Sequence, residues 1–145
     1  MVSSNKKAYL AGFLDGDGSI YVRLKQNASY KYGYQIAPYI VLFQSEKVRE
    51  LFEKLCNDIG LGYMRVRKDG VLEYTIGRVD SLKIFVGWVR PYLVLKKEQA
   101  NLLLTILDKK ERVANAKDFE KLMKLVDRFR ELNYSKKRKT RRLTP

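Results

Sequence analysis

The sequence predicts an α+β fold in which four antiparallel strands form one sheet and helices cover one face of it. Apolar and polar residues alternate in two pairs of stretches, at 20–25 with 34–43 and at 62–67 with 71–76, as they do in half-buried strands. Apolar residues at helical spacing precede, separate and follow these pairs. The expected order is therefore α-β-β-α-β-β-α-α-α, which is two helix-hairpin units followed by further helices.

The first hairpin is expected to follow a helix over residues 5–16. Its first strand places Ile20, Val22 and Leu24 on one face, and a polar turn at 26–33 leads to the second strand. That strand directs Ile36, Ile40 and Leu42 inward. Pro38 interrupts it, which predicts an edge or a bulge at that point.

The second unit begins with a helix over residues 46–59 that ends at Gly60. Its inward positions are expected to be Val48, Leu51, Phe52, Leu55 and Ile59. The turn at 68–70 contains Asp-Gly, which readily adopts positive φ and predicts the second hairpin. Three further helices are expected at 80–89, 97–107 and 118–132.

Composition limits the function. The 145 residues suit one domain, expected over 1–135, with 136–145 as a basic tail. Lys and Arg outnumber Asp and Glu by 30 to 16, and the net charge of +14 favours a polyanionic partner, with nucleic acid ahead of an anionic membrane surface. No apolar run approaches the ~20 residues of a membrane span, and no secretion signal is expected. We expect neither a membrane partner nor a small-molecule substrate.

Missing residue types narrow the chemistry further. The chain has no His, which excludes Ser-His-Asp catalysis and His-ligated zinc and leaves carboxylate, Lys, Tyr or Arg chemistry. Cys56 is the only cysteine, so it cannot form an intrachain disulfide. Its place in an apolar helical run favours a plain buried thiol.

The sheet face turned away from the helices is rich in cations, amides and aromatic side chains. A basic two-hairpin ribbon can enter a DNA major groove, with Arg and Gln reading bases and Lys holding phosphates. The alternative is an ordinary solvated strand face. The residues expected on it are Tyr21, Arg23, Lys25, Gln35, Ala37, Tyr39, Val41, Tyr63, Arg65, Arg67, Glu73 and Thr75.

The first helix carries the most informative motif. Ala8, Gly12 and Gly16 recur every four residues and leave one stripe nearly bare of side chains, which allows a second helix to approach closely. The simplest partner is the same helix of a second copy, and Asp17 would then lie near its symmetry mate. Two such carboxylates would share divalent cations, and Mg²⁺ suits their oxygen atoms. The alternative is that Asp-Gly-Asp-Gly at 15–18 is only a helix cap and turn.

The motif and several later segments resemble the single-motif, homodimeric LAGLIDADG endonucleases encoded in organelle introns. The resemblance runs from about residue 7 to 140. It rests on Leu10-Ala11-Gly12-Phe13, Asp15-Gly16-Asp17-Gly18-Ser19-Ile20, Asp58-Ile59-Gly60, Gly62-Tyr63, Pro91-Tyr92-Leu93, Leu95-Lys96, Gln99-Ala100-Asn101-Leu102, Leu132-Asn133 and Ser135-Lys136. It implies an αββαββα fold with a saddle-shaped sheet and trailing helices, and location in a chloroplast or mitochondrion.

The resemblance also implies roles for individual residues. Asp17 matches the catalytic metal ligand, Gly16 offers a carbonyl to two or more shared Mg²⁺ ions, Gln44 positions water, and Lys96 lies near the scissile phosphates. Without the resemblance, Gln44 is equally consistent with a polar residue at the start of a helix. Lys96 is equally consistent with one member of an ordinary basic pair with Lys97. The implied dimer contacts are Ala8, Ala11, Gly12, Asp15 and Gly16. The implied DNA contacts are Ser19, Arg23, Lys25, Asn27, Ser29, Tyr30, Gln35, Tyr39, Arg65, Arg67, Glu73, Thr75 and Lys136.

The expected activity is a site-specific, Mg²⁺-dependent double-strand break in a long pseudo-palindromic DNA. Ala37, Tyr39 and Val41 stand where related enzymes often carry polar groups, which predicts thymine-methyl contact or shape readout there. Residues 136–142 hold six cations, read either as a generic basic tail or as a phosphate-binding segment. An intron RNA maturase and an inactive DNA-binding repressor are the alternative functions.

Overall fold

The helices and strands follow one another in the predicted order. Two short 3-10 turns are added, one before the second helix and one after the third. The computed structural model describes residues 2–133, so Lys136 and the tail at 136–145 lie outside the described residues. The elements are α1 (Ser4–Asp17), β1 (Gly18–Gln26), β2 (Tyr34–Ser45), η1 (Glu46–Val48), α2 (Arg49–Ile59), β3 (Tyr63–Val66), β4 (Val71–Ile76), α3 (Val79–Val89), η2 (Arg90–Tyr92), α4 (Lys97–Glu111) and α5 (Ala116–Leu132).

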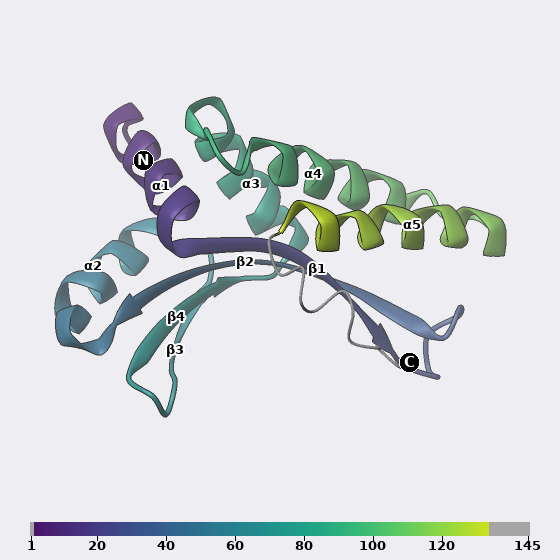
Figure 1. Cartoon of the computed structure of the whole chain (residues 1–145), viewed down its shortest axis with the longest axis horizontal. Helices are drawn as coiled ribbons and strands as arrows, with labels where there is room; N and C mark the ends of the chain where they lie inside the picture. The colour runs from purple at the N-terminus through teal and green to yellow at the C-terminus, as the bar shows by residue number, and fades with distance from the viewer. Residues whose placement is uncertain (1, 134–145) are drawn as a thin grey trace.

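The four strands form one antiparallel sheet in the order β1-β2-β4-β3, which confirms the predicted sheet. The sheet is arched, with α3, α4 and α5 above its convex face (Figure 1). Its concave face carries no helix among residues 2–133. Two adjacent register rows cross all four strands: one consists of Ser19, Val41, Thr75 and Tyr63, and the other of Gly18, Leu42, Tyr74 and Met64.

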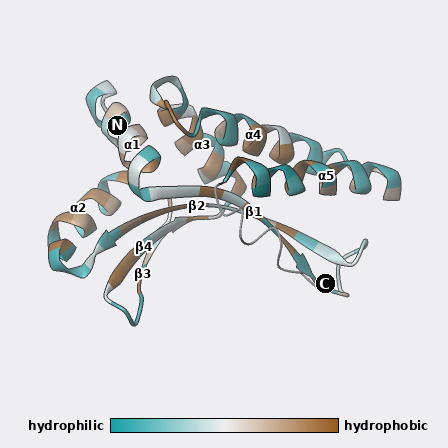
Figure 2. Cartoon of the chain, in the orientation of Figure 1, coloured by the Kyte–Doolittle hydropathy of each residue, from teal (hydrophilic) through white to brown (hydrophobic). Residues whose placement is uncertain are grey.

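The core lies between the sheet and the helices. Ile20, Ile40 and Leu42 are fully buried on the sheet, as the alternation predicts, and Leu10 and Leu14 of α1 pack into the same cluster. Helices α4 and α5 alternate hydrophobic and hydrophilic residues along their length, because only one face of each meets the core (Figure 2). Within residues 2–133, no helix is long and apolar enough to cross a bilayer.

Cys56 is confirmed as a buried thiol on α2. Burial, reinforced by the negative charge of Glu53, raises the pKa of its thiol to about 12. The thiol is therefore protonated at neutral pH and acts as a packing group.

Pro38 occupies an edge position within β2, as predicted. It pairs with Val22 of β1, whereas β4 pairs with β2 only from Ile40 onward. The distal half of β2 therefore has a neighbour on one side only, and a missing N–H is tolerated at such an edge.

The second unit corrects two predicted core positions. Val48 is 40% exposed and Leu51 is 72% exposed, although helical spacing placed both inward. Val48 belongs to the turn η1 and directly precedes α2, and the buried face of α2 is formed by Phe52, Cys56 and Ile59 instead. The following hairpin is confirmed, although β3 ends at Val66 rather than at residue 67.

Candidate active site

Helix α1 passes directly into β1, with Asp17 as its last residue and Gly18 as the first residue of the strand. A Cβ on Gly18 would lie 2.7 Å from Leu14 Cδ1 and 3.0 Å from the backbone of Leu14. Only glycine fits this close approach without a shift of the helix. The junction leaves the Asp17 carboxyl exposed where α1 meets the sheet.

The bare stripe predicted on α1 is exposed at Ala8, Gly12 and Gly16. A Cβ added to Gly12 or Gly16 would meet nothing within 4 Å, so the stripe is open to a partner. Ala11 was wrongly placed in the dimer interface, because it is 0% exposed within the protomer. At about 100° per residue, Ala11 turns well away from its neighbour Gly12 and toward the core.

Asp15 has a role within the protomer that the sequence did not reveal. Its carboxylate accepts hydrogen bonds from the backbone N–H groups of Val94 (2.8 Å), Leu95 (3.1 Å) and Lys96 (2.9 Å). These groups precede α4, which has no side-chain cap of its own at Lys96. Asp15 therefore anchors the segment that leads into α4, from about 80 residues away in the chain.

Lys96 is brought to the end of α1, as its predicted role requires. Its Nζ donates a hydrogen bond of 2.8 Å to the main-chain oxygen of Asp15. That carbonyl belongs to the last turn of α1, where helix carbonyls lack partners within the helix and a cation is favourable. The Lys96 side chain thus lies within one helical turn of Asp17.

Gln44 lies on the strand next to the α1 junction. Gly18 pairs with Leu42, so Gln44 stands two residues beyond that pair on β2. Its Oε1 accepts a hydrogen bond of 2.8 Å from the backbone N–H of Ser45. Strand register and the Lys96 hydrogen bond therefore place Asp17 of α1, Gln44 of β2 and Lys96, just before α4, near the C-terminal end of α1.

The concave sheet face holds the polar residues that the alternation assigned to it. Glu73 lies opposite Arg65 in register and accepts a hydrogen bond of 2.8 Å from its guanidinium. Arg67 binds Asp69 at 2.7 Å and lies 3.6 Å from Glu73. These pairs hold both guanidinium groups against β4, which limits their freedom before any ligand binds.

The oxygen atoms at the junction fit a hard divalent cation. Asp17 presents an exposed carboxylate, and the neighbouring Gly16 has an exposed backbone. Mg²⁺ takes six oxygen ligands and keeps several of them as water, so it suits a site with few protein ligands. Among residues 2–133, no three or more acidic or Cys side chains gather to hold a metal. The cation shared between two copies stays a prediction.

The model of the LAGLIDADG endonuclease family matches residues 10–107, from α1 into α4. The DNA endonuclease I-CreI of Chlamydomonas reinhardtii is 39% identical over 133 residues, which cover 91% of this chain and 81% of I-CreI. The chain belongs to the LAGLIDADG endonuclease family. This membership confirms the resemblance drawn from the motif.

A second relative of this LAGLIDADG protein is the DNA endonuclease I-CvuI of Chlorella vulgaris, 35% identical over 136 residues that cover 92% of the chain and 83% of the relative. The crystal structure of I-CvuI with the I-CreI target DNA and Mg superposes with a TM-score of 0.85 at 31% identity. It covers 92% of this chain and 85% of that one. The α+β LAGLIDADG fold is thereby confirmed.

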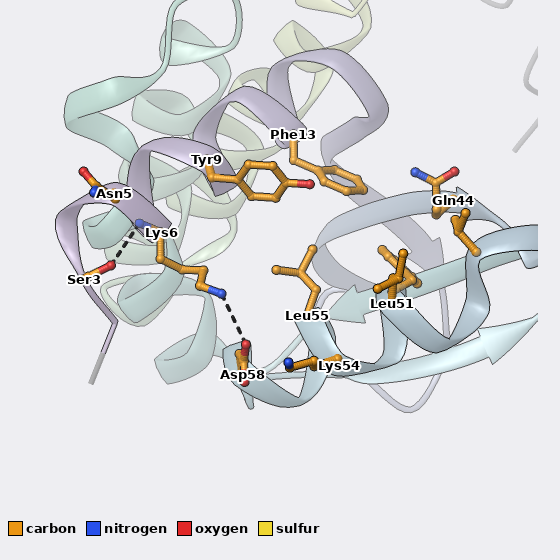
Figure 3. A pocket seen from close by; sticks show the side chains of 12 residues that line it. Ser3, Asn5, Lys6, Tyr9, Phe13, Gln44, Leu51, Lys54, Leu55 and Asp58 are labelled. Carbon is orange, nitrogen blue, oxygen red and sulfur yellow. Dashed lines mark hydrogen bonds and ion pairs between the residues drawn. The ribbon is translucent and has the colours of Figure 1, made fainter.

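The LAGLIDADG helix α1 and the neighbouring α2 enclose a groove of about 650 Å³. Tyr9 and Phe13 of α1 and Leu51 and Leu55 of α2 form its walls, with Gln44 at the end nearest the strands (Figure 3). Tyr9 is 58% exposed. The groove is an open apolar surface, and helical periodicity had assigned its α2 residues Leu51 and Leu55 to the core of the protomer.

A second exposed apolar segment lies beside the other flank of α1. Val94 is 79% exposed and Leu95 is 72% exposed, although Asp15 holds the backbone of both. On a helical wheel, Asp15 lies on the opposite side of the bare stripe from Tyr9 and Phe13. The stripe is therefore flanked by a groove on one side and by an apolar protrusion on the other.

Proposed function

We propose that this LAGLIDADG protein is a homodimeric, Mg²⁺-dependent endonuclease that makes a double-strand break at one long pseudo-palindromic DNA site. The convergence of Asp17, Gln44 and Lys96 beside a basic, concave sheet face carries the proposal. The I-CvuI complex with DNA supports it, because that relative shares the whole α+β framework. A binding module needs only the basic sheet, so the retained polar site favours cleavage over a repressor or a maturase.

Each residue has a distinct part in phosphodiester hydrolysis. Asp17, with the Gly16 carbonyl, would hold the divalent cation, which polarises water and stabilises developing charge when bound. Lys96 carries a cation at the same helix end and would stabilise the charge that grows on the scissile phosphate. Gln44 would orient the attacking water from the end of β2.

The concave face would read one half-site in each protomer. Arg65 and Arg67 are suited to guanine edges, and Lys25 to phosphates. The contacts proposed from the resemblance share this face or the turn beyond it: Ser19, Arg23, Lys25, Asn27, Ser29, Tyr30, Gln35, Tyr39, Arg65, Arg67, Glu73 and Thr75. Location in a chloroplast or mitochondrion is proposed from the family resemblance.

The proposed dimer follows from the two flanks of α1. When a two-fold axis runs along the bare stripe, the flank of one copy faces the opposite flank of the other. The Val94–Leu95 protrusion of each protomer would then enter the groove beside Leu51 of its partner. This arrangement would bury exposed apolar surface twice and bring both Asp17 carboxyls to the same end of the interface.

A charge-pairing cycle tests this arrangement. Leu51→Lys and Leu95→Glu should each raise the dissociation constant of the dimer about tenfold or more, since each leaves a charge in an apolar contact. The dissociation constant of the double variant should be at least about tenfold lower than the two single effects together predict. The reason is that the lysine introduced in the groove of one protomer would face the glutamate introduced on the protrusion of the other. Sedimentation equilibrium measures all four constants.

The matched control pairs Leu51→Lys with Ile84→Glu, since Ile84 is 46% exposed on α3 and does not line the groove. That pair should be additive. Additive behaviour of Leu51→Lys with Leu95→Glu would sink the proposed contact, and a native chain that sediments as a monomer at micromolar concentration would sink the dimer itself.

The activity is tested by selecting cleaved molecules from a randomised duplex DNA library in Mg²⁺ and sequencing their ends. The native chain should cut one long near-palindrome, and chelation of the metal should stop cutting because the carboxylate site then has no cation. Tight enrichment of duplex without any cut would indicate a repressor. Enrichment of intron RNA with no duplex would indicate a maturase.

A further inference from the structure

The turn between β1 and β2 is a self-contained unit. The Asn27 N–H donates to the Gly33 carbonyl at 2.8 Å and the Gly33 N–H to the Tyr30 carbonyl at 2.9 Å. The Asn27 side chain also accepts hydrogen bonds from the N–H and the hydroxyl of Ser29. Gly33 has φ +80°, which other residues rarely adopt. The turn therefore moves as one body, and it carries the proposed DNA contacts Asn27, Ser29 and Tyr30.

The hairpin alone does not fix where this body sits. β4 supports β2 only from Ile40 onward, so the distal half of the hairpin is a two-stranded ribbon. A two-stranded ribbon is marginally stable and twists freely compared with a wider sheet. The position of the turn relative to the rest of the concave face must come from another contact.

The turn itself contacts the helical layer through an aromatic stack. The ring centroids of Tyr32 and Phe119 lie 5.0 Å apart, with 25° between the ring planes. Phe119 is 9% exposed in the first turns of α5, at the end of that helix nearest the hairpin tip (Figure 1). A small cavity of about 250 Å³ beside the stack is lined by Tyr30 and Lys110, among others.

We propose that Tyr32 and Phe119 are positioning residues for DNA specificity. They hold the turn at a fixed height above the outer base pairs of each half-site without touching the DNA themselves. Phe119 belongs to the layer on the convex side of the sheet, away from the proposed DNA face. This inference rests on the proposed endonuclease function.

Phe119→Leu provides the test, since it removes the stack by changing a residue that lies away from the proposed DNA face. Cleavage is measured on a panel in which each base pair of the selected target is changed singly. Discrimination should fall about fivefold at the outer base pairs under the turn, the factor that corresponds to one aromatic pair, and stay unchanged at the centre. Tyr32→Leu should reproduce this profile, and Tyr32→Phe should retain the native one.

Phe129→Leu is the matched control, because Phe129 is also buried, at 3% exposed, near the other end of α5. It should lower stability and leave the profile native. Unchanged outer discrimination in both Phe119→Leu and Tyr32→Leu, or an equal loss at every position, would overturn the inference while the native chain still cuts. A native chain that neither cuts nor enriches any duplex would instead overturn the proposed function and the inference with it.

Discussion

Asp17→Asn is expected to slow DNA cleavage by at least about a thousandfold and to leave DNA affinity largely intact. The substitution keeps the shape of the side chain but removes the charge that would hold the divalent cation, and a metal contributes several kcal/mol to the transition state, or about three decades in rate. DNA binding is proposed to depend mainly on the basic sheet face, which the change does not touch. Single-turnover cleavage and gel-shift titration on the selected target measure the two quantities.

The same substitution should make the protein slightly more stable. Asp17 is the last residue of α1, where the helix dipole disfavours a negative charge by roughly 0.5 kcal/mol. A carboxylate kept at an unfavourable and exposed position is typical of a functional group. Asp127→Asn, an exposed change within α5, is the matched control and should leave cutting unchanged. Cleavage by Asp17→Asn at a native rate would remove Asp17 from the mechanism.

Asp15→Ala is expected to lower the free energy of unfolding by about 3 kcal/mol. Three backbone N–H groups lose their acceptor, and each hydrogen bond to a charged group contributes roughly 1.5–3 kcal/mol, which partial exposure of Asp15 reduces. For a chain of this length the melting temperature should fall by about 10 °C. Thermal unfolding followed by circular dichroism, at one fixed protein concentration, measures the shift.

Asp108→Ala is the control for Asp15→Ala. Asp108 of α4 forms an exposed ion pair of 3.3 Å with Arg112, the residue that follows the helix, and such pairs contribute less than about 1 kcal/mol. A melting temperature for Asp15→Ala that falls no further than for Asp108→Ala would show that Asp15 does not anchor the start of α4. Cleavage should also weaken in Asp15→Ala, since the Lys96 backbone loses one of its supports.

The hairpins were predictable because the residues within each hairpin determine its strand faces and its turn. Alternation fixes which strand residues face inward, and the Asp-Gly turn at 69–70 needs only a positive φ, which Gly70 has at +85°. The gathering of Asp17, Gln44 and Lys96 was expected from the family resemblance, since no local pattern links three separate elements.

The wrong predictions concern helices that have an exposed apolar surface in addition to the face that meets the core. Val48 and Leu51 share helical spacing with Phe52, but periodicity does not say whether an apolar face meets its own core or another molecule. Ala11 was placed beside Gly12 in the dimer interface by the resemblance, although adjacent helical residues face different directions. The Asp15 contact joins segments about 80 residues apart, and no local pattern encodes such a pairing.

The absence of any loop between α1 and β1 has a consequence for the geometry of cutting. Because Asp17 ends the helix and Gly18 begins the strand, the carboxyl cannot shift independently of β1, the strand proposed to read the bases. With Asp17 in its proposed role, the rigid backbone would set the number of base pairs between the recognised sequence and the broken bond. Variants with altered base preference on β1 and β2 should break DNA at the same offset from the new recognition sequence.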